Sequence, residues 1–487
     1  MSLRCPVRLL VLALVVAAPL VAQQPITIEE AVRLAQQRGH QSAAARATRD
    51  AARYRTQAFG SRLLPQLSLG GNVPAYNRSI ISVIQPDGST QYRPQQQTNA
   101  TLSMQLTQTL PITGGSLFVS SSLGRLTRSG TLSTETWSST PVSVGLRQEL
   151  FRPNAARWDR LEQNVRTGLD ARTYLEAEED IALQTTELFF NVYAARVAYN
   201  NAVTNAAVND TLYRLNSGRF DVGRIGENDL LQSELALLRA RTSVEGARLQ
   251  YDRAVSALRL ALAISAGAPF DVAVTPVVPA YDVDTTRAVS YALQNGATVS
   301  SVELQAVQAR RRVTEAKLSN SPGATVQATY GYNQVAGSAA VAYQNLLEAR
   351  QLTLSVQLPL WNWGAHGETV RAAEADRDRV TTLAEATLDQ LAHDAHFAAL
   401  QLAQARRNVA LYAKADSVDG RRFEVAYNRY TIGRIAIDNL YLAQSEKDQA
   451  VGQVAESLRS YWRAHYQLRR LTLFDFATGQ PIRAEGR

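Results

Sequence analysis

The sequence GRFDVGRI at residues 218–225 returns 210 residues later as NRYTIGRI at residues 428–435. Each copy lies in a long tract without proline, at 154–268 and 360–480. Because proline kinks or breaks the interior of a helix, only such tracts let very long helices form unbroken. Internal repeats at a fixed offset indicate the architecture of a chain. The sequence therefore predicts one helical hairpin that is built twice.

The repeat extends beyond the two hairpins. At the same offset of 210, residues 147–151 (RQELF) match residues 357–361 (QLPLW). Further upstream, residues 31–39 match residues 288–296 at an offset of 257. Pro65 matches Pro322 at the same offset of 257, so the 47 additional residues fall between Pro65 and Glu149 of the first copy. The first copy therefore carries an enlarged version of whatever connects its helices.

The N-terminal residues 1–22 have the pattern of a cleavable signal peptide. Arg4 and Arg8 precede a short apolar run, and small residues follow up to Ala22, where we expect cleavage. A retained anchor helix is the alternative, but the run is too short to span a bilayer. The single cysteine, Cys5, lies in this segment, so a mature chain would have no disulfide. No later apolar run approaches the roughly 20 residues of a spanning helix, so any membrane segments must be strands.

The net charge of +8 comes almost entirely from arginine. These arginines are spread along the expected helices, alternate with acidic residues and follow an export signal. The charge pattern therefore favours a solvated helical surface over a nucleic-acid interface.

The expected elements alternate between long helices and strands. Thr27 and Glu30 form a capping box, and the helix that they begin should run over 28–63 and stop before Pro65. Alternation of apolar and polar residues then predicts strands over lengths close to those of tilted membrane strands. These segments are 67–73, 102–107, 117–123 and 142–150 in the first copy, and 326–332 and 352–360 in the second.

Helix lengths predict how the copies fit together. A helix over about 155–220 would reach about 100 Å at 1.5 Å per residue. Two shorter helices, 227–265 and 285–319, would together cover the same distance in return. The second copy repeats this with helices over 365–430 and 437–471, and the helix at 28–63 supplies the missing part. The predicted organisation is a signal peptide (1–22), a first repeat (23–265, strands about 65–151, helices 28–63 and 155–265), an equatorial linker (266–284), a second repeat (285–471, strands about 322–361) and a C-terminal equatorial segment (472–487).

Four to six strands cannot close a barrel, because the smallest spanning barrels have eight. An open sheet edge is not tolerated in lipid, since its backbone groups would lack hydrogen-bond partners. We therefore expect several subunits to share one barrel, with their helices sharing one tube below it.

These features resemble the TolC-like outer-membrane efflux proteins. The similar sequences are TIEEAVRLA at 27–35, LPLWNWG at 358–364 and LYLAQ at 440–444, and the order and double occurrence of the elements match over nearly all of the mature chain. The resemblance implies a mainly α-helical protein with a membrane β-barrel. Three copies would form a twelve-stranded barrel in the outer membrane and a twelve-helix α-barrel in the periplasm of a Gram-negative-type bacterium.

The resemblance also implies a function. The protein would be the outer-membrane channel of a tripartite efflux or type I secretion system, a passive exit duct served by a periplasmic adaptor (membrane fusion protein) and an inner-membrane RND or ABC transporter. The enlarged first copy departs from the family pattern. Two additional strands fit either an eighteen-stranded barrel or an extra hairpin outside a standard one.

The two repeated turns are the predicted periplasmic tip. Glycine at Gly223 and Gly433 permits the left-handed conformation that ends a helix without a side-chain clash. The resemblance implies that the adaptor grips these turns, and a plain helix cap is compatible with that role. Arg224 and Arg434 follow the glycines and are predicted either to pair with a neighbour or to remain solvated. The predicted docking residues are Arg219, Gly223, Arg224, Arg429, Gly433 and Arg434.

Four residues are candidates for a gate that polar contacts hold closed. By resemblance, Asp229 and Tyr430 fall on positions of one contact between the inner and outer hairpins. A helix N-cap, supported by Gln232, is the alternative role for Asp229. Asn439 and Leu442 occupy positions where some family channels carry aspartate rings, so a strongly cation-binding gate is not expected here.

Aromatic residues mark the junctions between strands and helices. Phe151, Trp361 and Trp363 suit an interfacial belt at the periplasmic face of the membrane, with packing in an equatorial core as the rival interpretation. His393 and His396 could share a helix face, but without a third ligand we expect packing and no metal. No nucleophile elbow, phosphate loop or paired-carboxylate motif occurs, so we expect neither an enzyme nor a cofactor.

A periplasmic coiled-coil scaffold without channel activity is the alternative function. It explains the long helices and the repeat, but leaves the six alternating segments unaccounted for. The sequence does not specify the cargo or the class of pump.

Overall fold

The computed structural model of the chain describes residues 25–129, 133–265, 270–319 and 321–483. The predicted signal peptide and Cys5 lie outside this range. The chain divides into two compact units, the first made of Met1–Ser42, Ile181–Pro279 and Ala405–Arg463, and the second of Ala43–Asp180, Ala280–Gln404 and Ala464–Arg487. The two longest helices, α3 (Ala155–Asp221) and α7 (Ala365–Thr431), each contribute residues to both units.

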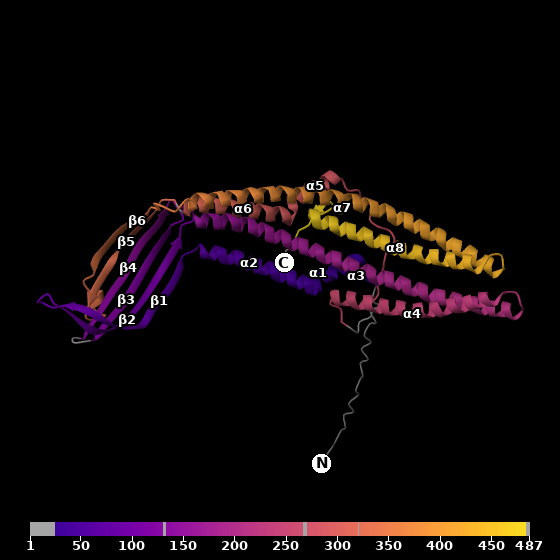
Figure 1. Cartoon of the computed structure of the whole chain (residues 1–487), viewed down its shortest axis with the longest axis horizontal. Helices are drawn as coiled ribbons and strands as arrows, with labels where there is room; N and C mark the ends of the chain where they lie inside the picture. Colours follow the sequence, from indigo (N-terminus) through magenta and orange to yellow (C-terminus); the bar gives the residue numbers. More distant parts are fainter. Residues whose placement is uncertain (1–24, 130–132, 266–269, 320, 484–487) are drawn as a thin grey trace, which may run out of the picture. The chain divides into compact units, whose positions relative to one another are not determined.

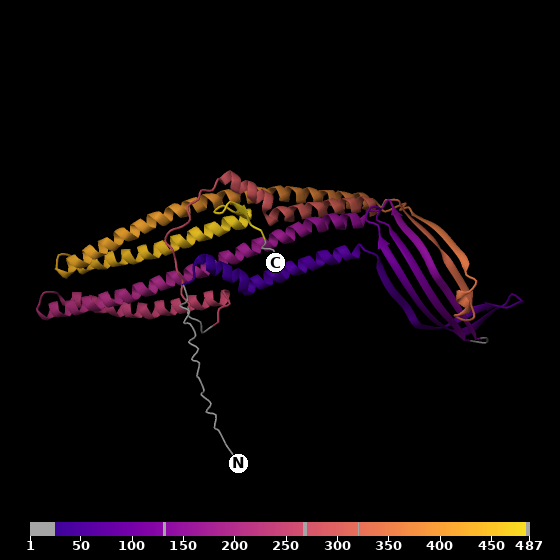
Figure 2. The ribbon, with the colours of Figure 1, turned by 180° about the vertical axis from the view of Figure 1, so that it is seen from behind.

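The first unit consists mainly of two helical hairpins. The C-terminal part of α3 turns into α4 (Glu227–Ala261), and that of α7 turns into α8 (Ile437–Thr472). Figure 1 and Figure 2 show each pair running side by side up to its turn. Salt bridges join α4 to α3 through Arg241 and Asp210, and α8 to α7 through Glu446 and Arg422.

The two hairpins of the first unit pack through α3 and α8. Asn205 of α3 donates to Asp448 of α8, and Arg459 of α8 donates to Asn191 of α3 at 2.9 Å. Away from the turns, the helices therefore lie in the order α4, α3, α8, α7, and α4 and α7 are the outer members there. Near the turns, a core of Leu212, Tyr430, Ile437 and Leu440 fills the space between the hairpins.

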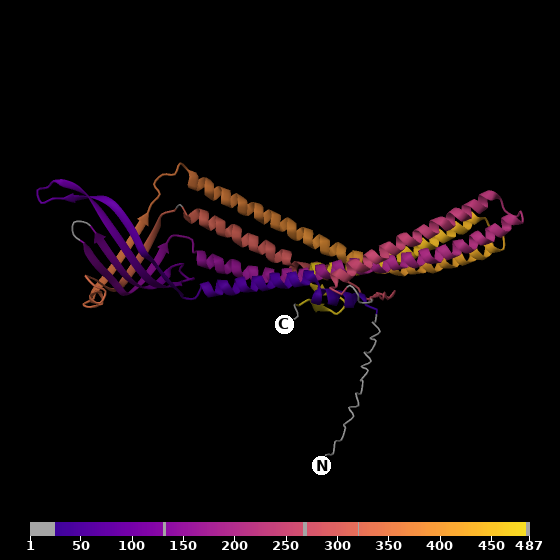
Figure 3. The ribbon, with the colours of Figure 1, turned by 90° about the horizontal axis from the view of Figure 1, so that it is seen from below.

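The second unit contains one six-stranded antiparallel sheet in the order β1–β2–β3–β4–β5–β6 (Figure 3). Every strand pairs with its neighbour in sequence. The strands are β1 (Gln66–Ile84), β2 (Thr90–Thr109), β3 (Ser116–Ser129), β4 (Thr134–Leu150), β5 (Gly323–Ala336) and β6 (Leu347–Gln357). The six strands that the alternation predicts are therefore present, and most are longer than predicted.

The helices of the second unit also form a row. Gln163 of α3 donates to Thr56 of α2 (His40–Arg62) at 3.0 Å. On its other side, α3 pairs with α6 (Ala297–Ser319), because Arg311 contacts Asp159 at 2.7 Å and Glu162 at 2.9 Å. Lys317 of α6 pairs with Glu374 of α7 at 2.7 Å. The order is therefore α2, α3, α6, α7.

Two predicted helices are each broken in two at a glycine. The helix predicted over 28–63 forms α1 (Ile28–Arg38) and α2, and the helix predicted over 285–319 forms α5 (Thr285–Asn295) and α6. Gly39 and Gly296 separate them in an extended conformation. A Cβ atom on Gly39 would lie 2.5 Å from the carbonyl oxygen of Ala35, and one on Gly296 would lie 2.9 Å from that of Ala292. The breaks thus depend on the absence of a side chain.

The remaining elements are short. A 3-10 turn, η1 (Val341–Tyr343), lies in the β5–β6 connection, and β7 (Phe474–Asp475) pairs with β8 (Gln480–Pro481) after α8. The helix predicted over 227–265 ends at Ala261. Within the described residues, no helix combines the length and apolar character that crossing a membrane requires.

Candidate functional site

The two repeated turns of the first unit have the same backbone geometry. Gly223 has φ +68° and its N–H donates to the carbonyl of Phe220 at 2.8 Å, while the N–H of Arg224 donates to that of Arg219 at 2.8 Å. This is the Schellman arrangement, in which a left-handed residue satisfies the last carbonyls of a helix. The second turn repeats it around Gly433, which has φ +75°. The left-handed glycine that the repeat predicts is therefore present in both turns.

Arg219 ties the first hairpin to the second. Its guanidinium donates to the carbonyl oxygen of Thr431 at 2.9 Å and lies 5.5 Å from the centre of the Tyr430 ring. Because Thr431 is the last residue of α7, the positive charge sits at the negative end of a helix dipole. Arg219 therefore acts within the chain at the junction of the two turns.

Tyr430 carries the buried part of the same junction. Its hydroxyl donates to Oδ1 of Asn216 at 2.8 Å, and both side chains are buried, at 6% and 0% exposure. We call the set of Asn216, Arg219, Tyr430 and Thr431 the hairpin latch. It joins α3 to α7 directly next to the turns.

A second polar contact joins the other two helices. Gln232 of α4 donates to Asp438 of α8 at 2.8 Å. Beside it, burial, with smaller contributions from Tyr430 and Asp438, raises the pKa of Tyr441 to about 12. Further along the hairpins, burial raises the pKa of Asp448, and its hydrogen bond from Asn205 opposes that rise. The contact surface between the hairpins is thus apolar, with a few hydrogen bonds across it.

The four predicted gate residues divide into two groups. Tyr430 lies in the hairpin latch, but its partner is Asn216, and no hydrogen bond within the described chain joins it to Asp229. The N-cap role considered for Asp229 is wrong, because Gly226 occupies that position and Gln232 bonds Asp438. Asn439 and Leu442 are exposed on α8, Leu442 at 52%.

The remaining docking residues face solvent. Arg224, Arg429 and Arg434 are exposed, in contrast to Arg219. The residues that precede the two glycines, Val222 and Ile432, are exposed at 70% and 64%. The turns therefore present arginine side chains beside uncovered apolar ones.

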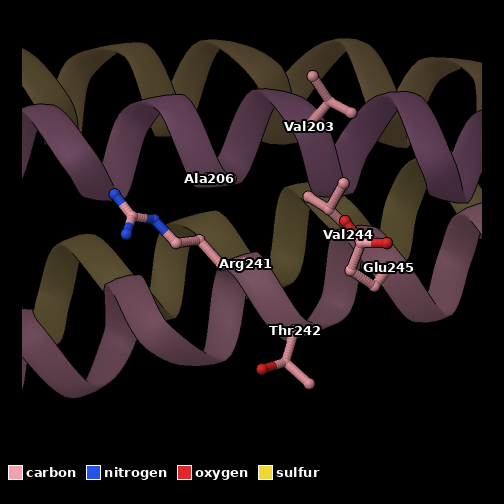
Figure 4. Close-up of a pocket in the computed structure, with 6 residues that line it drawn as sticks. All are labelled: Val203, Ala206, Arg241, Thr242, Val244 and Glu245. Carbon is pink, nitrogen blue, oxygen red and sulfur yellow. The ribbon is translucent and has the colours of Figure 1, made fainter.

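A shallow groove of about 560 Å³ lies between α3 and α4 in the first unit (Figure 4). Its lining residues are Val203 and Ala206 of α3 and Arg241, Thr242, Val244 and Glu245 of α4. Arg241 is held by Asp210 at 3.1 Å. The groove is an open seam between two packed helices.

The predicted interface aromatics lie at strand-to-helix junctions of the second unit. Phe151 directly follows β4, and Trp361 and Trp363 lie between β6 and α7. All three are exposed, at 70%, 76% and 89%, and the two tryptophan rings meet edge to face at 5.5 Å. The rival interpretation, packing in a core, is not what the structure shows for these side chains.

A buried charge cluster supports the helices of the second unit. Glu179 of α3 is 2% exposed and accepts two hydrogen bonds from Arg469 of α8, at 2.9 and 3.1 Å. Asp475 contacts the same guanidinium at 3.3 Å. Burial raises the pKa of Glu179, and the charge of Arg469 opposes that rise.

A histidine lies next to this cluster. Nδ1 of His465 lies 2.5 Å from the Tyr281 hydroxyl. Burial, with the nearby charge of Arg469, lowers the pKa of His465 to about 4. The imidazole is therefore neutral at neutral pH and serves as a packed polar residue.

The two histidines that the sequence places three residues apart on α7 pack on an aromatic ring. His393 and His396 lie 4.6 and 5.3 Å from the ring of Phe397. Among the described residues, no three His, Cys, Asp or Glu side chains come together as metal ligands would.

Sequence reasoning missed Asn216 and the internal role of Arg219. At the offset of 210, Asn216 corresponds to Ala426, so the repeat itself gave no reason to select it. One signal was present, because a buried asparagine in a helix interior has low helix propensity and needs a partner.

Comparison with known proteins places this arrangement in a known fold. No model of a protein family matches the sequence, and a search of curated proteins found no match. Solved structures do match. The outer membrane channel CmeC of Campylobacter jejuni is 15% identical with a TM-score of 0.66, over 94% of this chain and 87% of that one.

Two further outer-membrane proteins match over similar shares of both chains. The Vibrio cholerae outer membrane protein VceC is 13% identical with a TM-score of 0.63, over 93% of this chain and 96% of that one. The open state of the Neisseria gonorrhoeae outer membrane channel MtrE is 13% identical with a TM-score of 0.63, over 94% and 90%. The predicted fold class is confirmed by these matches, and the chain has the fold of the TolC-like outer-membrane channels.

Proposed function

We propose that three copies of this chain form an outer-membrane channel, the passive exit duct of a tripartite efflux or type I secretion system. The observation that carries the proposal is the sheet of the second unit. One of its faces is mainly apolar and the other mainly polar. Among the described residues, each of its outer strands, β1 and β6, has one unpaired edge. A sheet with one apolar face and open edges fits a membrane only when further copies close it.

The first unit supports the same assembly. Its outer helices, α4 and α7, carry apolar side chains that the described residues leave about half exposed or more. On α4, Leu231, Leu235 and Leu238 follow a spacing of four and three and are about half exposed. On α7, Leu411, Val418 and Val425 follow a spacing of seven, with exposures of 67%, 53% and 52%.

Such spacings produce a straight apolar seam along a helix, as in coiled coils. We infer that α4 of one copy packs against α7 of the next. Because these two helices lie at opposite ends of the row, the contact is heterologous and closes into a ring. Three copies of four helices give the twelve-helix periplasmic tunnel that the resemblance implies.

The turns around Gly223 and Gly433 are the proposed docking surface for a periplasmic adaptor. The exposure of Arg224, Arg429 and Arg434 beside Val222 and Ile432 supports this role, since arginine and apolar side chains are typical of protein interfaces. Arg219 is an internal positioning residue in this proposal. An RND or ABC transporter in the inner membrane would supply the energy, as the resemblance implies.

The hairpin latch is the proposed gate element. If the tunnel opens when α7 and α8 move away from α3 and α4, the bonds of Tyr430 and Arg219 must break, together with the bond between Gln232 and Asp438. Exposed Asn439 and Leu442 would line the constriction without a ring of negative charge. Such a gate would not bind cations strongly.

The aromatic residues Phe151, Trp361 and Trp363 are proposed to lie at the periplasmic face of the membrane. Their exposure at the strand-to-helix junctions supports this, because tryptophan rings are enriched at membrane interfaces.

The decisive experiment is the native mass of protein extracted with detergent from the outer-membrane fraction of cells that produce it. A detergent-corrected mass of three subunits, together with ion conductance in a planar bilayer, is the expected result. A water-soluble monomer or dimer would contradict the proposal and would leave the periplasmic scaffold as the better description.

A further inference from the structure

All six strands of the chain belong to one sheet, including the two that the enlarged first repeat adds. β2 pairs with β3 without interruption from Gln96↔Ser129 to Thr109↔Ser116. β1 pairs with β2 from Gln66↔Thr107 to Ile84↔Thr90, with one shift of register between Asn72 and Ala75. Figure 1, in which the strands are labelled, shows β1 and β2 on the β3 side of the sheet. A hairpin lying outside a closed barrel would instead have left β3 with an unpaired edge.

The alternation of the two faces also continues into these strands. On one face, an apolar row crosses five strands through directly paired residues, Leu67, Leu106, Val119, Val144 and Tyr330, and its β6 member is Arg350. The next row lies on the opposite face and is polar across four strands, through Ser68, Gln105, Ser120 and Ser143. Because β1 and β2 keep the same orientation as the others, they suit the same lipid and the same water-filled lumen.

The edges of the sheet are where a neighbour would bind. Leu69 on β1 and Leu354 on β6 are 68% and 62% exposed, whereas Leu106 and Val144 on inner strands are 38% and 42% exposed. With six strands that alternate in direction, β1 and β6 are antiparallel to each other. The β1 edge of one copy can therefore form an antiparallel ladder with the β6 edge of the next.

The register of the sheet sets the tilt that closure requires. One line of directly paired residues runs from Gln66 through Thr107, Phe118, Gly145 and Thr329 to Gln351. β6 continues beyond Gln351 to Gln357. If Gln66 at the start of β1 meets the end of β6 in the next copy, the stagger is one residue per strand. At about 3.3 Å per residue and about 4.8 Å between strands, this gives a tilt of about 35°, within the range of known membrane barrels.

The widths of sheet and helices agree with this closure. Six strands at that tilt span about 35 Å per copy, whereas four would span about 23 Å. The helix row of the second unit has four members, α2, α3, α6 and α7, and four helices at 8–10 Å spacing span about 32–40 Å.

We propose, on the basis of the channel function proposed above, that β1 of each copy pairs with β6 of the next and that three copies close an eighteen-stranded barrel. The interaction surface is the β1 edge, and its partner is a second copy of this chain. The barrel has a backbone diameter of about 34 Å, compared with about 22 Å for twelve strands at the same tilt. The enlarged first repeat therefore widens the exit of the duct.

Disulfide cross-linking tests which strands meet between copies. The only cysteine of the chain is Cys5, in the predicted signal peptide, so in the mature protein only the introduced cysteines can form disulfides. Ser68→Cys on β1 is combined in turn with Gln351→Cys, Thr353→Cys and Ser355→Cys on β6, all on the polar face. The matched control combines Ser120→Cys on β3 with Thr353→Cys, which would meet if β3 and β6 closed a twelve-stranded barrel.

At least one β1–β6 pair is expected to give covalent trimers on a non-reducing gel, and the β3–β6 pair none. An intact trimer in which only the β3–β6 pair cross-links, or in which no β1–β6 pair does, overturns the eighteen-stranded barrel while leaving the channel standing. Failure of all these proteins to form trimers would instead contradict the proposed function itself.

Electron microscopy of the detergent-extracted trimer gives an independent measurement of the diameter. We expect about 34 Å for the full chain. A variant lacking residues 66–107 is the matched control, because Gln108 already donates to the carbonyl of Leu63 at 2.8 Å and the cut ends therefore lie together. That variant should measure about 22 Å, and a full-chain diameter near that value would overturn the proposal.

Discussion

Removing one hydroxyl group from the hairpin latch should open the channel. In Tyr430→Phe, Oδ1 of Asn216 loses the donor that lies 2.8 Å away, in a site where both side chains are buried. Nδ2 of Asn216 is itself buried without a partner in the described chain, so the amide has little compensation. Leaving a buried acceptor unsatisfied costs about 1–3 kcal/mol.

This cost falls on the closed state, because opening exposes Asn216 to water. At about 1.36 kcal/mol per factor of ten, the ratio of open to closed hairpins should rise by about 5- to 150-fold per subunit. Arg219 remains bonded to Thr431, so the turn itself should stay folded. The expected phenotype is a leaky gate in a normally assembled trimer.

The assay is conductance of purified trimers in planar bilayers, with Tyr412→Phe as the control. Tyr412 lies on the same helix but is 37% exposed, so loss of its hydroxyl should change nothing. Asn216→Ala should also raise the conductance, and the double variant should rise by less than the sum of the two effects, because the residues share one bond. Additive effects, or a Tyr430→Phe trimer that conducts like wild type, would refute the latch.

Three further outcomes are expected. Gly223→Val forces a β-branched residue into a backbone conformation with φ +68°, at a cost of about 1–2 kcal/mol, and should abolish adaptor binding and export while trimers persist. The control, Gly218→Ala in the helix before the turn, should leave export normal. Because the pKa of His465 is about 4 in the folded state and about 6.5 in the unfolded state, protonation favours the unfolded state. The free energy of unfolding should therefore fall by on the order of 3 kcal/mol as pH drops from about 6.5 to about 4, which a falling melting temperature would show; a His465→Gln variant that keeps the same pH slope would show that another group is responsible. Val425→Glu on the apolar seam of α7 should prevent trimer formation, measured as native mass, while the circular dichroism spectrum stays helical. The control, Glu424→Gln at the exposed neighbouring position, should still form trimers, and a trimeric Val425→Glu protein would contradict the proposed seam.

Much of this fold can be predicted from local patterns in the sequence. The offset of 210 predicts both hairpins and both left-handed glycines, because a helix and its cap depend on residues within one or two turns. Alternation likewise predicts all six strands. Gly39 and Gly296 lie at matching places of the two copies and mark the helix breaks, but the helical pattern continues on both sides of each glycine and by itself predicts one helix.

The contacts within the hairpin latch are harder to predict from the sequence. Tyr430 was selected by resemblance, but its partner proved to be Asn216, 214 residues away, and not Asp229. Which side chains meet between two helices depends on the rotation and axial offset of each helix, and small changes in either exchange one partner for another. Neither quantity leaves a local pattern in the sequence.

The sequence by itself thus determined the repeated hairpins, the strands and their two faces, because helical and strand periods are local properties of the chain. Only the tertiary structure decided that β1 and β2 join the sheet, that Arg219 and Tyr430 meet across the hairpins, and that α4 and α7 are the outer helices. These are contacts between segments far apart in sequence, and packing, with the pairing of backbone hydrogen bonds, selects among them.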